Sequence, residues 1–246
     1  MNNIKPTIEV CFSPALLHLY NTAGAIVVII DVFRATSTIA AALHNGAHSV
    51  IPVASVDECI QLGLQDSNHI TAGERDGKIA EGLSYGNSPL DFPPSFIQGK
   101  TLVLTTTNGT RLLHMVQNAA AIITGSFLNL DAVCQFLLNS QRRVLLACAS
   151  WKDRFNLEDS LFAGAVIDML KGSFETNCDS ARAATHLFHA SHGNYLSFLT
   201  DSSHYLRLSG FGLKRDLEYC TTPNLHPVVP ILKGRALLPL QESALI

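Results

Sequence analysis

Carboxylates, arginines and hydroxyls recur at four places in this 246-residue sequence, each directly after an apolar run. Carboxylate oxygens suit a hard cation such as Mg²⁺, whereas arginines and helix N-termini suit phosphate or sulfonate. The mixture indicates a small polyanion bound together with a divalent metal. The candidate side chains are Asp31, Arg34, Thr36, Ser37, Glu74, Arg75, Asp76, Thr105, Thr106, Thr107, Asn108, Gly109, Thr110, Arg154, Glu158 and Asp159.

The segment T-T-T-N-G-T-R at 105–111 has two interpretations. Asn-Gly between apolar runs is a strong hairpin signal. The apolar residues at 112–116, however, fit a 3.6-residue period, which predicts a strand, a tight turn and a helix. The free N–H groups of that first helical turn would favour an anion, although Thr107 or Asn108 could simply cap the helix. We expect this segment to form a phosphate or sulfonate cradle.

Each group also has an explanation that involves no ligand. Asp31 could be a buried carboxylate that accepts backbone hydrogen bonds, and the hydroxyls after it could cap the next helix. Asn156 with Asp159 resembles a helix cap, and residues 74–77 could form a salt-bridged turn. The functional interpretation gains weight because four separate loops would converge beyond the carboxyl ends of the strands.

A competing constellation is C-A-S-W-K-D-R at 148–154. The spacing of Cys148 and Arg154 matches a phosphatase loop in which a thiolate with a lowered pKa attacks phosphate. The loop has no glycine, and Trp151 and Asp153 would crowd a phosphate. The six cysteines form no C-x-x-C pair, so most are expected to be core residues.

The elements that must position these residues alternate between strands and helices. A further helix is expected after residue 109. The alternation and the continuous apolar strands predict an α/β protein with three layers, α/β/α, around a largely parallel or mixed sheet. The predicted strands are 25–33, 48–54, 69–73, 101–107, 120–125 and 143–149, and the predicted helices are 36–45, 55–66, 129–139 and 157–171.

Three further segments complete the prediction. Residues 74–89 are rich in glycine and charge, and long irregular segments of this kind are often functional. Residues 179–220 have helical spacing, while the prolines in 226–240 predict edge strands or extended coil. No linker is evident, so we expect a single domain over 1–246 with a candidate C-terminal helical subregion at 179–246.

Composition excludes several classes of protein. The net charge of −3 argues against a general nucleic-acid binder, and no apolar run approaches the roughly 20 residues that span a bilayer. The N-terminus lacks the apolar core of a signal peptide, so we expect a cytoplasmic protein. So apolar a chain, at 47% hydrophobic residues, is expected to form a homo-oligomer. The ten histidines have no metal-binding spacing and are interpreted as structural.

Four segments together resemble the 2-phosphosulfolactate phosphatase family, and the resemblance extends in order over about 25–240. They are D-V-F-R-A-T-S-T (31–38), G-E-R-D-G (73–77) with Y-G-N-S-P (85–89), T-T-T-N-G-T (105–110), and R-F-N-L-E-D-S-L-F-A-G-A (154–165). One departure is visible, because Ser150 and Asp153 stand where we expect glycine in relatives.

The resemblance implies a magnesium-dependent phosphatase that converts (2R)-2-phospho-3-sulfolactate to 3-sulfolactate and phosphate, a step that belongs to coenzyme M biosynthesis in archaea. It also implies a three-layer fold. A non-catalytic phosphate or sulfonate sensor remains an alternative. The resemblance implies metal or acid–base roles for Asp31, Glu74, Asp76, Glu158 and Asp159, a catalytic role for Arg34, anion clamps at Arg34, Arg75 and Arg154, and substrate contacts from Ser37 and residues 105–110.

Overall fold

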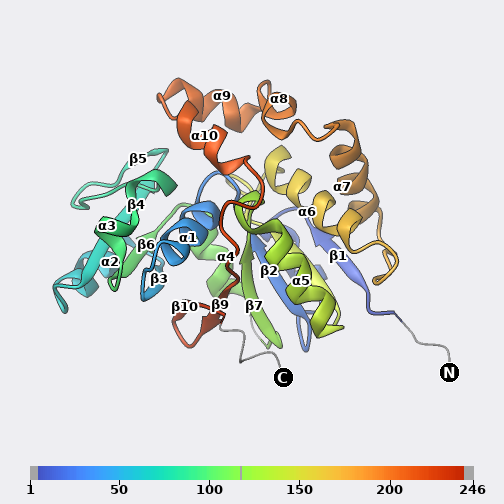
Figure 1. The fold of residues 1–246 in the computed structure, drawn as a ribbon, viewed down its shortest axis with the longest axis horizontal. Coiled ribbons are helices and arrows are strands. Elements are labelled where there is room, and N and C mark those ends of the chain that lie inside the picture. Colours follow the sequence, from blue (N-terminus) through green and yellow to red (C-terminus); the bar gives the residue numbers. More distant parts are fainter. Residues whose placement is uncertain (1–4, 117, 241–246) are drawn as a thin grey trace.

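A ten-stranded mixed sheet forms the centre of the molecule (Figure 1). The computed structural model describes residues 5–116 and 118–240. The strands lie in the order β1-β8-β2-β7-β9-β10-β3-β6-β4-β5. Their bounds are β1 Ile8–Cys11, β2 Ile26–Ile30, β3 Ser49–Val53, β4 His69–Arg75, β5 Lys78–Ile79, β6 Thr101–Thr105, β7 Ala121–Gly125, β8 Val144–Cys148, β9 Pro230–Lys233 and β10 Ala236–Pro239.

Helices cover both faces of the sheet, which confirms the predicted three-layer α/β/α fold (Figure 1). The helices are α1 Ala35–His44, α2 Val56–Gly63, α3 Pro94–Ile97, α4 Gly109–Met115, α5 Leu130–Ser140, α6 Leu157–Met169, α7 Asp179–Ala190, α8 Tyr195–Leu199, α9 Ser203–Gly210 and α10 Lys214–Cys220. Short 3₁₀ turns lie at Pro14–Leu19, Pro89–Asp91 and Phe127–Asn129.

Strand β2 explains why the sheet is buried on both sides. All five of its residues are buried, and successive side chains of a strand point to opposite faces. Val27 and Ile29 therefore join the core that contains α1 and α4. Val28 and Ile30 join the core that contains α5, α6 and α7. The continuous apolar run in the sequence thus reflects a central strand of a covered sheet.

The sheet consists of two parallel blocks separated by a hairpin. One block is β1, β8, β2 and β7, and the other is β3, β6 and β4. The β9–β10 hairpin pairs antiparallel with both, through Ile231 with Ile123 and through Leu237 with Val50. Strand β5 pairs antiparallel with β4 at the edge.

The predicted helices and strands between 25 and 171 are confirmed within a few residues of their expected ends. The predicted cap of α2 is present, because the Glu58 N–H donates to Ser55 Oγ at 3.1 Å. Strand β6 ends at Thr105 and α4 begins at Gly109. The Asn-Gly pair therefore opens a helix, and the hairpin interpretation of this segment is wrong.

The prediction of edge strands or coil at 226–240 is also wrong, because β9 and β10 lie inside the sheet. Proline lacks an N–H donor and is normally confined to edges. Here Pro230 and Pro239 face each other at the open end of the hairpin, where the ladder to the neighbouring strands is not continued. The prolines therefore remove no hydrogen bond between the hairpin and its neighbours.

Helices α8, α9 and α10 lie together over the ends of the strands (Figure 1). Leu199, Leu208 and Leu217 from these helices belong to the same core as β2 and α6. Helix α7 packs closely on α6, since a Cβ at Gly164 would lie 2.1 Å from the Ala184 carbonyl oxygen. The C-terminal helices are thus held against the sheet above the candidate site.

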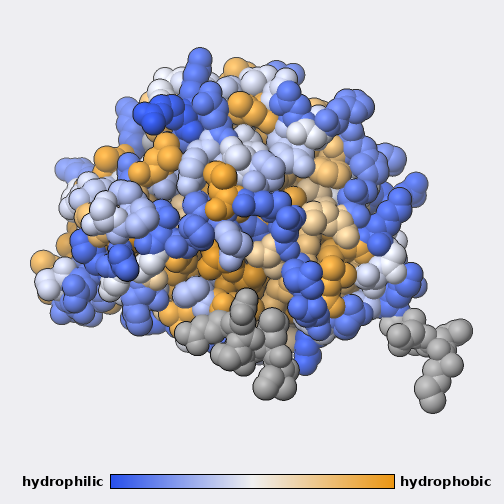
Figure 2. Space-filling view, viewed as in Figure 1, coloured by the Kyte–Doolittle hydropathy of each residue, from blue (hydrophilic) through white to orange (hydrophobic). Residues whose placement is uncertain are grey.

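Among the described residues, no helix combines the length and the apolarity that crossing a membrane requires. Hydrophilic residues dominate much of the face seen in Figure 2, with apolar surface near its centre. A groove of about 540 Å³ is lined by Phe136, Ile231 and Leu240, among others. The expected homo-oligomer remains a prediction.

Candidate active site

A small cavity lies where the ends of β2, β4, β6 and β8 meet helix α9. Its volume of about 20 Å³ is close to that needed for one water molecule. Strands from both parallel blocks contribute, so the expected convergence of separate loops occurs. The lining residues are Asp31, Phe33, Arg34, Glu74, Gly77, Asn87, Thr106, Thr107, Asn108, Trp151, His204, Arg207 and Leu208.

Asp31 follows β2 directly and is 8% exposed. Its backbone is fixed by Thr36, because the Asp31 N–H donates to Thr36 Oγ1 at 3.1 Å and the Thr36 N–H donates back to the Asp31 carbonyl. Burial is the main cause that raises the pKa of the Asp31 carboxyl to about 7; His204 opposes it, and the charges of Glu74 and Glu158 act in the same direction as burial. Such a carboxyl can accept or release a proton near neutral pH.

Gly109 allows α4 to approach Asp31. A Cβ at this position would lie 2.7 Å from Asp31 Oδ2 and 2.9 Å from the Ala35 Cβ. Any larger residue would therefore displace the carboxylate or the start of α1. The glycine of T-T-T-N-G-T is required for close packing around Asp31.

Glu74 ties the Thr-rich turn to the β4–β5 turn. Its Oε1 accepts hydrogen bonds from the N–H and the hydroxyl of Thr107, both at 2.9 Å, and its Oε2 accepts the Gly77 N–H at 2.8 Å. Thr106 and Thr110 also hydrogen-bond to each other. Several donors of the predicted cradle are thus used within the protein, although Thr106, Thr107 and Asn108 do line the cavity.

Asp159 accepts hydrogen bonds from the two segments that follow β2 and β8. Its Oδ1 accepts the Val32 N–H at 2.9 Å and its Oδ2 accepts the Ser150 N–H at 3.1 Å. Burial, followed by the charges of Glu158 and Asp31, raises the pKa of the Asp159 carboxyl well above its usual range. Asp159 therefore fixes the segments after β2 and β8 relative to each other.

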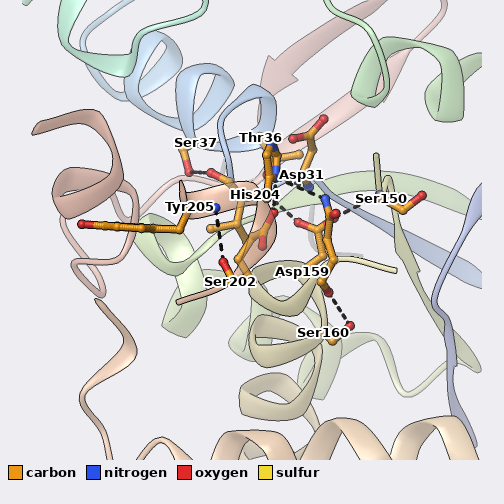
Figure 3. A network of polar contacts seen from close by, with 12 residues as sticks. Asp31, Thr36, Ser37, Ser150, Asp159, Ser160, Ser202, His204 and Tyr205 are labelled. Carbon is orange, nitrogen blue, oxygen red and sulfur yellow. Dashed lines mark hydrogen bonds and ion pairs between the residues drawn. The ribbon is translucent and has the colours of Figure 1, made fainter. Parts of the chain in front are cut away.

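Glu158 and His204 form a buried pair beside Asp31. Glu158 is fully buried, and its Oε1 lies 2.5 Å from His204 Nδ1, while its Oε2 has no hydrogen-bond partner. In Figure 3 the side chains of Asp31, Asp159 and His204 gather at one place, although they come from the segment after β2, from α6 and from α9. The pair links α6 to α9 and leaves one carboxylate oxygen uncompensated.

Arg34 supplies a buried cation. It is 5% exposed, and its Nη1 lies 2.5 Å from Asp216 Oδ2. The other oxygen of Asp216 accepts the Ser88 hydroxyl at 3.0 Å. Because Arg34 precedes α1 and Asp216 lies on α10, this ion pair connects the start of α1 to α10.

Arg207 supplies a second cation from α9. Its guanidinium lies 4.5 Å from the centre of the Trp151 ring, a cation–π distance. Its Nε is buried without a hydrogen-bond partner. Burial lowers the pKa of Arg207 from its usual value, yet an arginine remains charged in proteins.

The other predicted residues lie around the cavity or away from it. Ser37 is buried and donates to the Val32 carbonyl. Arg75 donates to the hydroxyl of Thr105 at 3.0 Å. Ser37, Arg75 and Thr105 do not line the cavity. Asp76 is exposed near Lys152, and Arg154 is exposed as well. These last two residues do not join the cluster around Asp31.

Cys148 is unsuited to the nucleophilic role considered for it. The residue is 1% exposed at the end of β8, and burial raises the pKa of its thiol well above the usual value. A thiolate nucleophile needs the opposite shift. Neither Cys148 nor Arg154 lines the cavity, so the C-x₅-R spacing does not form a phosphate loop here.

Sequence reasoning missed His204, Arg207 and Asp216. The histidines were interpreted as structural because they lack metal-binding spacing, yet His204 lines the cavity. One signal was available, since positions three apart share a helix face and His204 and Arg207 do so on α9. No local pattern indicates that Asp216 would pair with a residue 182 positions away.

The carboxylates around the cavity fit a divalent metal that needs few protein ligands. Among the described residues, no group of three or more His, Cys, Asp and Glu side chains is arranged to hold an ion. Mg²⁺ needs fewer protein ligands, because it is usually bound by one or two carboxylates, water and substrate phosphate. Asp31 lies on the cavity wall, and Glu158, whose charge acts on the Asp31 carboxyl, has an unpartnered Oε2, so these two carboxylates are the candidates.

Comparison with known proteins assigns the chain to a class of phosphoric monoester hydrolases. The model of the 2-phosphosulpholactate phosphatase family matches residues 11–235. The chain therefore belongs to this family. Proteins named probable 2-phosphosulfolactate phosphatase are similar to it. The one from Thermotoga petrophila is 43% identical over 83% of this chain and 88% of its own, and the one from Symbiobacterium thermophilum is 35% identical over 88% and 95%.

Proposed function

We propose that this protein hydrolyses (2R)-2-phospho-3-sulfolactate to 3-sulfolactate and phosphate in a reaction that requires Mg²⁺. The observation that carries the proposal is a buried carboxyl, Asp31, with a pKa of about 7 in a cavity that also contains two arginines, Arg34 and Arg207. The family membership supports the same substrate class. A trianionic substrate needs such cationic partners.

Each residue around Asp31 has a distinct task in this proposal. Arg34 binds the phosphoryl group and balances its charge in the transition state. Asp31 takes the proton of the attacking water or attacks phosphorus itself. Glu74 and Asp159 accept backbone N–H groups and thereby hold the loops that carry the reacting groups.

The residues that would hold Mg²⁺ are Asp31 and Glu158. A bound cation would offset the burial and the repulsion that together raise the pKa of Asp31, and it would give the buried Oε2 of Glu158 a partner. When bound, the ion would neutralise charge on a phosphoryl oxygen. Asp76 is exposed, and the oxygens of Glu74 and Asp159 already accept hydrogen bonds, so these three are weaker candidates.

The first test is phosphate release from 2-phosphosulfolactate with Mg²⁺ and again with EDTA. We expect release that needs Mg²⁺ and that is lost in Asp31→Asn. Asp179→Asn is a matched control, because Asp179 is fully exposed on α7. Equal release in EDTA would contradict the metal requirement, and full activity of Asp31→Asn would remove the assigned role of Asp31.

A further inference from the structure

We propose that Arg207 binds the sulfonate group of the substrate, with the Trp151 ring as the surface that holds its guanidinium in place. This inference rests on the proposed function and adds to it the residue that selects a sulfonated ester over an ester without sulfonate.

Arg207 has hydrogen-bonding capacity that the protein does not use. Arg34 is paired with Asp216, whereas Arg207 has no carboxylate within ion-pair distance among the described residues and its Nε is an unpartnered buried donor. Leaving a buried donor unsatisfied is unfavourable. A guanidinium presents several N–H groups in a planar fork that matches an oxyanion, so an incoming sulfonate would supply the missing partner.

Trp151 fixes the direction of this guanidinium. The centre of the Trp151 ring lies 4.5 Å from Arg207 Cζ and 4.8 Å from Lys152 Nζ. Lys152 is exposed, approaches Asp76 at 3.8 Å and does not line the cavity. Arg207 does line it. Of the two cations on the ring, Arg207 is therefore the one placed to contact a ligand.

The two arginines lie at different depths. Arg34 is 5% exposed and immediately follows the loop of Asp31, whereas Arg207 is half-buried on α9. The phosphoryl group must reach the buried carboxylates to react, so it belongs with Arg34. Arg207 is therefore assigned to an anionic group of the substrate that does not react.

The covalent structure of the substrate decides which group that is. The carboxylate carbon is attached to the same carbon as the phosphate ester, whereas the sulfonate is attached to the adjacent methylene. Sulfur is thus one bond farther from phosphorus than the carboxylate carbon is. The sulfonate is therefore the anion that can reach farthest from the reacting centre, and the inference assigns it to Arg207.

Calorimetric titration with 3-sulfolactate and with lactate, which lacks the sulfonate, tests the inference without turnover. We expect Arg207→Met to weaken 3-sulfolactate binding about tenfold or more, as for one lost charge-assisted hydrogen bond, and to leave lactate binding unchanged. Arg207→Lys should retain part of the affinity. Arg182→Met, at an exposed arginine of α7, should bind both compounds as the unmodified protein does.

A kinetic comparison separates this inference from the proposed function. In Arg207→Met, kcat/KM for 2-phosphosulfolactate should fall toward the value for 2-phospholactate, and the latter value should not change. An equal fall in kcat/KM for both esters, or no fall for either, would overturn the assignment of the sulfonate to Arg207. If the unmodified protein released no phosphate from either ester, the proposed function would fail, while the titrations would still decide whether Arg207 binds the sulfonate. Circular dichroism spectra establish that each variant is folded.

Discussion

At the scale of single residues, Asp31 is held in a state that favours its protonated form. Its carboxyl is buried, and the negative charges of Glu74 and Glu158 act in the same direction as burial. A group placed for stability alone would have its charge compensated. Asp31 instead keeps a pKa of about 7, which suits a group that exchanges a proton near neutral pH.

This pKa makes the stability of the protein depend on pH. An aspartate in the unfolded chain loses its proton near pH 3.8, whereas Asp31 in the folded protein holds it until about pH 7. The folded state therefore binds more protons in this window, and its stability falls as pH rises through it. The total effect is roughly 4 kcal/mol.

Asp31→Asn should remove this contribution. In EDTA, the variant should be more stable than the unmodified protein at pH 8, and the two should converge near pH 4, as measured by urea unfolding. Subtracting the two curves cancels the titration of all other groups. A difference in unfolding free energy that stays constant between pH 4 and pH 8 would contradict the raised pKa.

At the scale of elements, the start of α4 determines the geometry around Asp31. Gly109→Ala would place a Cβ 2.7 Å from Asp31 Oδ2, so the helix or the carboxylate must move. We expect a loss of about 1–3 kcal/mol in the free energy of unfolding, as for overpacking elsewhere, together with a large fall in kcat.

Gly210→Ala is the matched control for this prediction. Nothing lies within 4 Å of a Cβ at Gly210 in α9, and alanine favours a helix by up to about 1 kcal/mol over glycine. This variant should keep its activity and be equally or more stable. If both substitutions had the same effect on kcat, close packing at Gly109 would not be the reason.

The loop after β8 contains residues in conformations that favour glycine. Ser150 has a φ of 55° and Asp153 a φ of 60°, at the two positions where glycine is expected in relatives. The hydroxyl of Ser150 is also buried without a hydrogen-bond partner. The backbone hydrogen bond from Ser150 to Asp159 does not need a side chain.

Ser150→Gly should therefore stabilise the protein. Relief of the left-handed conformation gains about 1–2 kcal/mol, and the greater freedom of glycine in the unfolded chain offsets roughly 0.5–1 kcal/mol of it. A net gain near 1 kcal/mol corresponds to a rise in Tm of about 2–4 °C for a chain of this size. A lower Tm by thermal circular dichroism would show that the Ser150 hydroxyl has an unrecognised partner.

Much of the sheet could be predicted from sequence because its signals are local. The run at β2 and the cap at Ser55 depend on neighbouring residues, and both are confirmed. The place of β9 and β10 could not be predicted, because it depends on pairing with strands more than 100 positions away. The same reason applies to the site, where Asp31 was found from its strand but His204, which pairs with Glu158, was not.

At the scale of the whole molecule, the cavity is completed by the C-terminal helices. His204 and Arg207 come from α9 and Asp216 from α10, whereas the carboxylates come from the ends of strands and from α6. A Cβ at Gly77 would lie 2.8 Å from the Phe211 ring, so the β4–β5 turn also contacts the end of α9. Residues from these helices and from the ends of the strands together line a cavity of about 20 Å³.

The ion pair between Arg34 and Asp216 attaches α10 to the start of α1. Both side chains are nearly buried, and removing one partner of a buried pair leaves the other charge uncompensated at a loss of about 3–5 kcal/mol. We therefore expect Asp216→Asn to lower the free energy of unfolding by an amount in this range. The Arg34 side chain would also lose its fixed position, so phosphate release should fall with it.

Urea unfolding and hydrogen exchange together test this arrangement. Asp179→Asn breaks an exposed pair with Arg182 and should change stability by less than about 1 kcal/mol. Backbone amides of α10 should exchange faster in Asp216→Asn than in the unmodified protein, while those of β2 keep their relative protection. If exchange in α10 were unchanged and stability fell everywhere equally, Asp216 would support the core as a whole, and the ion pair would not be what holds α10 in place.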